Sequence, residues 1–188
     1  DAMDNCPEML QQLKQLNLHN VHIIKQNYIS STQSNIYDSI VSNAALHWMK
    51  FPQFLNVINS QLKPNGYCNL AIYGYQTSYE LRHLLPKIGK SLALPSDDFP
   101  TLNQLQTCGT HLFKQWHINT ITKTLTFKSI KDLLLLQRKT GVKKNRPIKG
   151  LWTPTTCNNL KNAYYDTYGQ IQLTYDIHIC SGHKPFNM

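Results

Sequence analysis

The stretch IVSNAALHWMKFPQFLNVINSQLKPNGYCNLAIYG, residues 40–74, contains a strand–helix–strand unit. Apolar runs at its two ends predict strands that are covered on both faces, as in a parallel sheet. Residues 51–62 have the periodicity of a helix, whose buried side would carry Phe54, Leu55, Ile58 and Leu62. The turn at residues 63–66, Lys-Pro-Asn-Gly, is expected to stop this helix because Pro cannot continue it and Asn-Gly readily adopts positive φ. This unit indicates an α/β fold.

The rest of the chain extends the alternation of strands and helices. Strands are predicted at residues 21–25, 37–43 and 67–73, with helices from Pro7 and at 78–88, the second capped by Ser78. The second half predicts a helix over 101–108 closed by Gly109, one strand or two within 112–127 (with any break near Asn119), helices over 129–140 and 154–168, and a final strand over 172–180. The last strand alternates cleanly and is expected to be antiparallel, at or near the sheet edge. We therefore predict one α/β domain with a mostly parallel sheet and helices on both faces.

Composition limits the class of protein. The 188 residues are 41% hydrophobic, and the longest aliphatic run, Leu133–Leu136, is far shorter than the ~20 residues of a membrane span. The first residues lack the basic and apolar regions of a secretory signal. Five widely spaced cysteines without a Cys-x-x-Cys pair predict reduced thiols in the cytoplasm and no metal site. No membrane association is expected.

The charge is strongly basic, and much of it lies in one segment. The net charge is +9, and no acidic residue occurs between Asp132 and Asp166. A nucleic acid, an anionic membrane, an acidic protein and a merely solvated basic face would all fit this charge. Residues 139–149 contain no aromatic side chain on which a base could stack, which argues against nucleic acid.

Several motifs resemble class I S-adenosylmethionine-dependent methyltransferases, whose sheet is Rossmann-like. The sequence of residues 2–10, AMDNCPEML, is similar to the second strand of that fold, ending in an acid before a helix. Four further motifs resemble malonyl-[acyl-carrier protein] O-methyltransferases: Gln76-x-x-x-Glu80-Leu81, Leu125-Thr126-Phe127, Thr140-Gly141-x-x-x-Asn145 and Leu173-Thr174-Tyr175-Asp176-Ile177. The resemblance covers nearly the whole chain, although mitochondrial complex I assembly factors of the same superfamily share much of it.

This resemblance implies a function. Malonyl-[acyl-carrier protein] O-methyltransferases methylate the free carboxylate of malonyl-acyl-carrier protein, which opens the pimeloyl branch of biotin biosynthesis, with S-adenosyl-L-methionine as cofactor. The alternatives are a methyltransferase-fold respiratory assembly factor or protein-modifying enzyme, and a non-catalytic relic. The first strand and glycine-rich loop of the family would precede Asp1, so we expect an N-terminally incomplete, monomeric domain over residues 1–188 with a basic lid insertion around 129–168.

The resemblance also assigns cofactor-binding residues at the carboxyl ends of strands, where ligands bind in open α/β sheets. It places Asp4 on the ribose hydroxyls, although a helix-capping role is the alternative. Asn5 and Cys6 would line the adenine pocket, with Asn27 and Tyr28 also near the adenine. Ser42 and Asn43 would lie near the methionine part, although they could equally cap an ordinary loop.

Few catalytic side chains are expected, because a malonyl carboxylate with a pKa near ~4 is already ionised at neutral pH. The remaining task is to hold that carboxylate in line with the methyl group. The candidates are Asn145, Arg146, Tyr75 and Gln76. The acidic carrier protein would be recognised by a basic cluster, Lys139, Lys143, Lys144, Arg146 and Lys149, on a segment that could close over the acyl chain.

Overall fold

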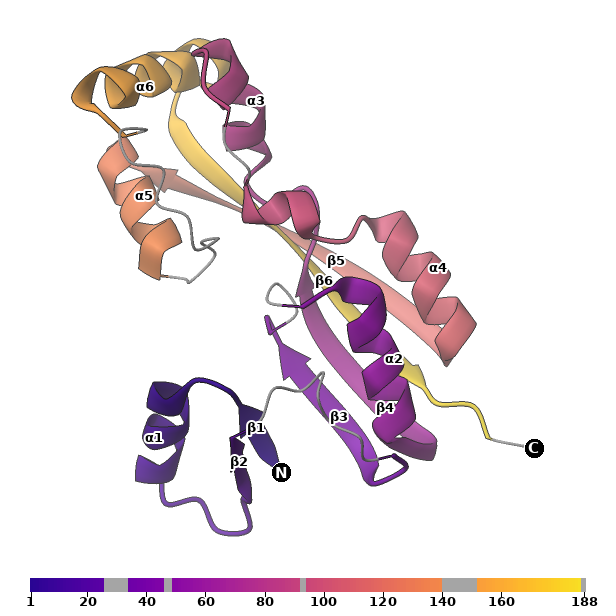
Figure 1. Ribbon diagram of the computed structural model, residues 1–188. Helices are drawn as coiled ribbons and strands as arrows, with labels where there is room; N and C mark the ends of the chain where they lie inside the picture. The colour runs from indigo at the N-terminus through magenta and orange to yellow at the C-terminus, as the bar shows by residue number, and fades with distance from the viewer. Residues whose placement is uncertain (26–33, 46–48, 92–93, 140–151, 187–188) are drawn as a thin grey trace.

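The computed structural model describes residues 1–25, 34–45, 49–91, 94–139 and 152–186 (Figure 1). Strands and helices alternate along the first half, as the sequence predicts. The elements are β1 (Ala2–Asp4), α1 (Pro7–Gln15), β2 (Ile23–Lys25), β3 (Tyr37–Asn43), α2 (Phe51–Gln61), β4 (Leu62–Tyr73), α3 (Tyr79–Lys87), the short 3-10 helix η3 (Pro95–Asp98), α4 (Leu102–Leu112), β5 (Lys114–Phe127), α5 (Ile130–Lys139), α6 (Pro154–Tyr168) and β6 (Ile171–His183).

The strands form two sheets. The larger has the order β3-β4-β6-β5, in which β3 and β4 are parallel and β6 runs antiparallel to both of its neighbours. The predicted antiparallel last strand is therefore confirmed, one position in from the edge. The smaller sheet pairs β1 with β2 in parallel and shares no ladder with β3 among the described residues. A hydrogen bond of 2.8 Å from the Tyr37 hydroxyl to Asp1 Oδ2 joins the two sheets where they lie side by side (Figure 1).

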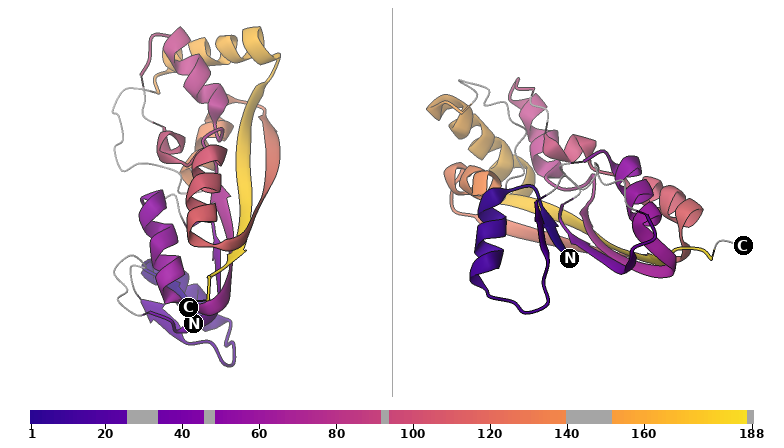
Figure 2. Two further views of the ribbon diagram at one scale, coloured as in Figure 1. Left: turned by 90° about the vertical axis from the view of Figure 1, so that its right-hand side faces the viewer. Right: turned by 60° about the horizontal axis from the view of Figure 1, so that its bottom comes forward.

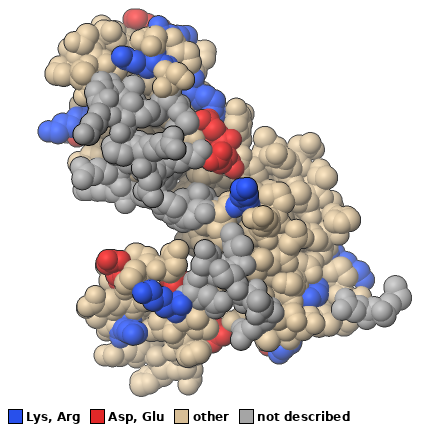
Figure 3. Space-filling model, viewed as in Figure 1, with Lys and Arg blue, Asp and Glu red and all other residues tan. Residues whose placement is uncertain are grey.

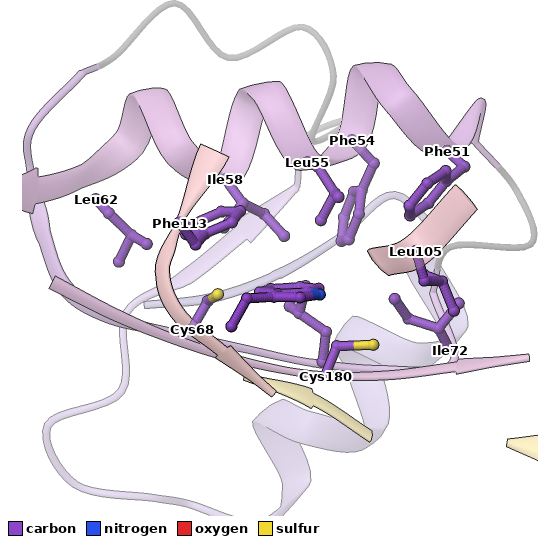
Figure 4. Packing of buried hydrophobic residues seen from close by; sticks show 12 residues of the cluster. Phe51, Phe54, Leu55, Ile58, Leu62, Cys68, Ile72, Leu105, Phe113 and Cys180 are labelled. Atoms are coloured by element: carbon purple, nitrogen blue, oxygen red, sulfur yellow. The ribbon is translucent and has the colours of Figure 1, made fainter. Parts of the chain in front are cut away.

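Two hydrophobic clusters cover opposite faces of the larger sheet. The first packs α2 and α4 on the face that carries Cys68, Ile72 and Cys180, and Figure 4 shows Phe54 and Leu55 of α2 pointing toward these strands. The second packs α3, α5 and α6 around Leu173 and Tyr175. Odd- and even-numbered residues of β6 point to opposite faces of the strand, and the helices of the two clusters gather at opposite ends of the long twisted β5–β6 ladder (Figure 2). Helices on both faces were predicted and are confirmed.

Beyond the end of β4, side chains supply hydrogen bonds to the backbone of β6. Beyond Tyr73 the partner of β6 is the segment that leads into α3, in which Ser78 N–H donates to Thr174 O (2.8 Å). Glu80, which is fully buried, accepts hydrogen bonds from the Thr174 N–H (3.0 Å) and the Thr174 hydroxyl (2.6 Å). The Thr77 hydroxyl donates to the Asp176 carbonyl (3.1 Å) and accepts the Asp176 N–H (3.1 Å). These contacts satisfy backbone groups that a shorter neighbour strand leaves unpaired.

The structure decides three local predictions. Helix α4 continues through Gly109 to Leu112. Gly109 serves packing rather than helix termination, because a Cβ at this position would overlap the Trp116 indole. Of the one or two strands predicted within 112–127, the structure has one, β5, whose register shifts between Lys114 and His117. The 63–66 turn does end α2, but it lies within β4 as an irregularity, with Asn65 at φ 61° and hydrogen-bonded to the C-terminal segment.

Candidate ligand site at the carboxyl ends of the strands

Two neighbouring cavities adjoin β3 and β4: the first runs along β3, and the second opens at the carboxyl end of β4. The first, of about 180 Å³, lies between β1 and β3; it is lined by Asp1, Met3, Tyr37, Ser39, Ile40, Val41, Ser42, Ala45, Met49 and Phe54. The second, of about 800 Å³, lies between the start of α2, the end of β4 and the η3–α4 segment. Met49 lines both cavities, so they adjoin where the chain enters α2. The second cavity lies within the size range of ligand sites, about 300–1,000 Å³.

The second cavity, here called the β4 cavity, has aromatic walls and a polar rim. Phe51, Tyr73 and Phe99 supply rings, of which those of Tyr73 and Phe99 are stacked with centroids 6.0 Å apart. The polar lining residues are Lys50, Tyr75, Asp97, Asp98, Thr101 and Gln104. Apolar walls with a few polar groups are typical of sites that bind an organic ligand and fix its orientation.

A buried His–Asp pair shapes the backbone at the end of β4. His178 Nε2 lies 3.4 Å from Asp176 Oδ2, and His178 Nδ1 lies 2.9 Å from the Thr120 hydroxyl. Burial lowers the pKa of His178 below its ordinary value, and the nearby Asp176 carboxylate opposes this shift. A Cβ at Gly74 would lie 2.3 Å from both Asp176 Oδ2 and His178 Nε2, so only glycine fits there. The pair therefore determines where the chain leaves β4 and places Tyr75 at the cavity.

The predicted cofactor residues follow strand ends as expected, but they do not all reach a cavity. Asp4 ends β1, and its Oδ1 accepts the Cys6 N–H at 2.8 Å in a local turn, whereas the N-cap residue of α1 is Cys6 and no side chain caps that helix. Ser42 lines the first cavity, whereas Asp4, Asn5, Cys6 and Asn43 line neither. Asn27 and Tyr28 lie outside the described residues.

The residues predicted to hold the substrate carboxylate also do not all reach a cavity. Tyr75 lines the β4 cavity, whereas Gln76 is exposed and lines neither cavity. Asn145 and Arg146 lie outside the described residues, as do Lys143, Lys144 and Lys149 and the side chain of Lys139. On the face shown in Figure 3 the described Lys and Arg side chains are scattered, so a basic carrier-protein surface stays a prediction about residues 139–149.

Sequence reasoning missed most of the β4 cavity. Phe99, Gln104 and Asp97 come from the η3–α4 segment, which the pattern showed only as a loop and a helix. Their one sequence signal is the Pro-bounded stretch PSDDFP, residues 95–100, because acids and an aromatic clustered in a short loop are unusual for a simple connection. Among the described residues no group of three His, Cys, Asp or Glu side chains could hold a metal ion, and no described helix is long and apolar enough to cross a membrane.

Comparison with solved structures identifies the architecture. A Bacillus halodurans protein described as a methyltransferase superposes with a TM-score of 0.62 at 13% identity, over 98% of this chain and 82% of its own. A phosphoethanolamine N-methyltransferase of Haemonchus contortus, solved with S-adenosylhomocysteine, gives a TM-score of 0.55 at 14% identity, over 97% of this chain and 42% of its own. The chain has the fold of a class I S-adenosylmethionine-dependent methyltransferase.

Sequence comparisons agree with this methyltransferase fold. The family model for a methyltransferase domain matches residues 1–70. A malonyl-[acyl-carrier protein] O-methyltransferase of Porphyromonas gingivalis is 26% identical over 147 residues, which are 76% of this chain and 54% of that protein. A second enzyme of that name, from Ilyobacter polytropus, is 24% identical over 185 residues, 97% of this chain and 67% of that protein. The chain thus spans about half the length of the first of these relatives and two thirds of the second.

Proposed function

We propose that this chain catalyses S-adenosylmethionine-dependent methylation of the free carboxylate of malonyl-acyl-carrier protein, the reaction that opens the pimeloyl branch of biotin biosynthesis. The observation that carries the proposal is the similarity to the Ilyobacter enzyme along 97% of this chain. The methyltransferase fold and the β4 cavity beside its strand ends support it.

The described residues fit the proposed cofactor. The Asp4 carboxylate uses one oxygen for the Cys6 N–H, and carboxylate oxygens can accept several hydrogen bonds, so the ribose hydroxyls could also be held there. Ser42 presents a short polar side chain to the first cavity, which allows close approach of a ligand. When bound, the cofactor would supply an electrophilic methyl group on a sulfonium. Asp4, Asn5, Cys6, Ser42 and Asn43 are the described residues we propose for its site.

The acceptor side needs orientation rather than proton transfer. A malonyl carboxylate is ionised at neutral pH, so no general base is required, and orientation alone can contribute ~7–11 kcal/mol. At the β4 cavity, the Tyr75 hydroxyl, the Lys50 ammonium and the Gln104 amide can donate hydrogen bonds to its oxygens. We propose Tyr75 as the anchor among the described candidates. Asn145 and Arg146 stay predictions.

The proposed partner is the acyl-carrier protein itself. A positive charge of +9 would attract an acidic carrier and raise the rate of encounter. Such steering is screened by salt, so the KM for the carrier-bound substrate should rise with ionic strength more steeply than the KM for malonyl-coenzyme A. The lysines and arginine of residues 139–149 are the proposed contact residues.

Methyl transfer from labelled S-adenosylmethionine to malonyl-acyl-carrier protein tests the proposal directly, with calorimetry on S-adenosylhomocysteine beside it. Asp4→Asn should weaken S-adenosylhomocysteine binding roughly tenfold or more, because hydrogen bonds to a charged group are worth about 1.5–3 kcal/mol. Asp166→Asn, which makes the same change at an exposed acid of α6, is the matched control and should bind normally. Absence of both binding heat and transfer by the wild-type chain would refute the proposal and favour a non-catalytic relic.

One observation favours a second candidate. A mitochondrial arginine hydroxylase of Mus musculus is 38% identical over 63 residues, a higher identity over only 33% of this chain and 18% of that protein. A protein-modifying enzyme or respiratory assembly factor is therefore the alternative function. Complementation of a biotin auxotroph separates the two, because only the carboxyl methyltransferase restores growth without biotin.

A further inference from the structure

Arg82 of α3 joins two walls of the β4 cavity although it does not line the cavity itself. Its Nη2 donates to the Tyr75 carbonyl (2.8 Å) and to the Ser96 hydroxyl (2.9 Å), and its Nε donates to Asp97 Oδ1 (3.0 Å). The guanidinium carbon also lies 4.0 Å from the centre of the Tyr75 ring. One planar side chain thus contacts the backbone and the ring on one side and the η3 turn on the other.

The η3 turn is closed by the same carboxylate that Arg82 holds. It is four residues long, and a 3-10 segment of that length has weak internal hydrogen bonds. The second oxygen of Asp97 accepts the Leu94 N–H at 2.8 Å, so the carboxylate that Arg82 holds also closes the turn. Tyr75 is tied to the same segment a second time, because its N–H donates to Pro100 O at 3.0 Å.

These contacts suit a local role better than a role in overall stability. The side chains of Arg82 and Asp97 are 23% and 37% exposed, and ion pairs at that exposure contribute little to folding. Lysine could keep one charge contact, but it could not supply the fork that reaches three acceptors or stack on the ring. Loss of the guanidinium should therefore loosen the cavity wall and leave the fold intact.

We propose that Arg82 is a positioning residue for the methyl acceptor: it holds Tyr75 and the η3 turn together as one wall of the β4 cavity. The role of Arg82 in acceptor binding rests on the proposed function, in which Tyr75 anchors the substrate carboxylate. A wall that is out of place would weaken acceptor binding and leave the cofactor residues at β1 and β3 untouched.

The test compares Arg82→Ala and Arg82→Lys with Lys87→Ala, which removes a charge from the exposed side of the same helix. In Arg82→Ala we expect the KM for malonyl-acyl-carrier protein to rise about tenfold or more, with S-adenosylhomocysteine affinity within about twofold of wild type. Arg82→Lys should fall between wild type and Ala, and Lys87→Ala should match wild type. A merely destabilised protein would lose active fraction, which lowers kcat and leaves KM unchanged.

Amide hydrogen exchange gives a readout that needs no substrate. In Arg82→Ala the amides of Tyr75, Asp97 and Phe99 should exchange faster, while those of β6 keep their protection. An unchanged KM or unchanged exchange at these amides would overturn the proposal. If wild-type protein transfers no methyl group, the proposed function and the acceptor role both fail, and faster exchange would then support only the wall contact.

Discussion

Replacing Gly109 by alanine should destabilise the protein, although alanine is the better helix former. In an unobstructed helix interior this change stabilises by about 1 kcal/mol. Here the new Cβ would lie 2.0 Å from Trp116 Cε2 and 2.1 Å from Trp116 Nε1. Carbon atoms pack at about 3.5 Å or more, so the indole would have to retreat by roughly 1.5 Å.

The indole has little room for that retreat. Phe113 stacks on it with centroids 5.2 Å apart, and a Cβ at Gly182 would lie only 2.9 Å from another of its ring carbons. Overpacking of a well-filled core costs typically 1–3 kcal/mol, and we take the upper end because the overlap involves rigid ring atoms. After subtraction of the gain of about 1 kcal/mol in helix propensity, the net loss in the free energy of unfolding is about 2 kcal/mol.

A double-mutant cycle checks this reasoning. Urea unfolding followed by circular dichroism would measure Gly109→Ala alone and in a Trp116→Leu background, where the obstructing ring is gone. The substitution should destabilise the wild type by about 2 kcal/mol and stabilise the Leu background by up to about 1 kcal/mol, a coupling of about 3 kcal/mol. The same effect in both backgrounds, or stabilisation of the wild type, would refute the steric explanation.

Three further outcomes follow from buried or capping side chains. Burial holds the pKa of His178 below its ordinary value, so as pH falls below about 6.5 the unfolded chain takes up a proton before the folded chain does, and the free energy of unfolding should decline. In pH-dependent melting, His178→Gln should show a smaller decline than wild type. An unchanged slope would contradict this. In urea titration, Glu80→Gln should lower the free energy of unfolding by about 2 kcal/mol, since an amide NH₂ would face one of the two Thr174 donors. If the variant were as stable as wild type, the carboxylate would not be needed. Thr153→Ala removes the oxygen that caps α6 and should cost about 1 kcal/mol, whereas Thr155→Ala, at an exposed position two residues further on, should be nearly neutral; equal costs would exclude a capping effect.

Local periodicity was sufficient to predict most of the sheet and its helices. The strand at Tyr37–Asn43 and the start of α2 at Phe51 agree to the residue, because apolar runs and proline positions are local signals. The helix that runs through Gly109 could not be predicted in this way. That glycine reads as a stop signal, and its real role depends on an indole that the chain brings back from the next strand.

The candidate site was predicted only in part, for the same physical reason. Residues at or just after strand ends, such as Ser42 and Tyr75, can be located because strand ends meet at one edge of a sheet. The walls formed by Asp97 and Phe99 come from a connection whose path depends on tertiary contacts, among them the Arg82 fork. A lone arginine on a helix carries no sequence signal for such a role.

The division of the strands into two sheets has a consequence for cooperativity. Among the described residues no backbone ladder crosses from β1 to β3, so opening between these two strands breaks side-chain contacts such as the hydrogen bond from Tyr37 to Asp1. A ligand bound to Asp4 and Ser42 together would span that boundary and oppose the opening by RT ln(1 + [L]/Kd). Such a ligand would act as a non-covalent cross-link between the two sheets.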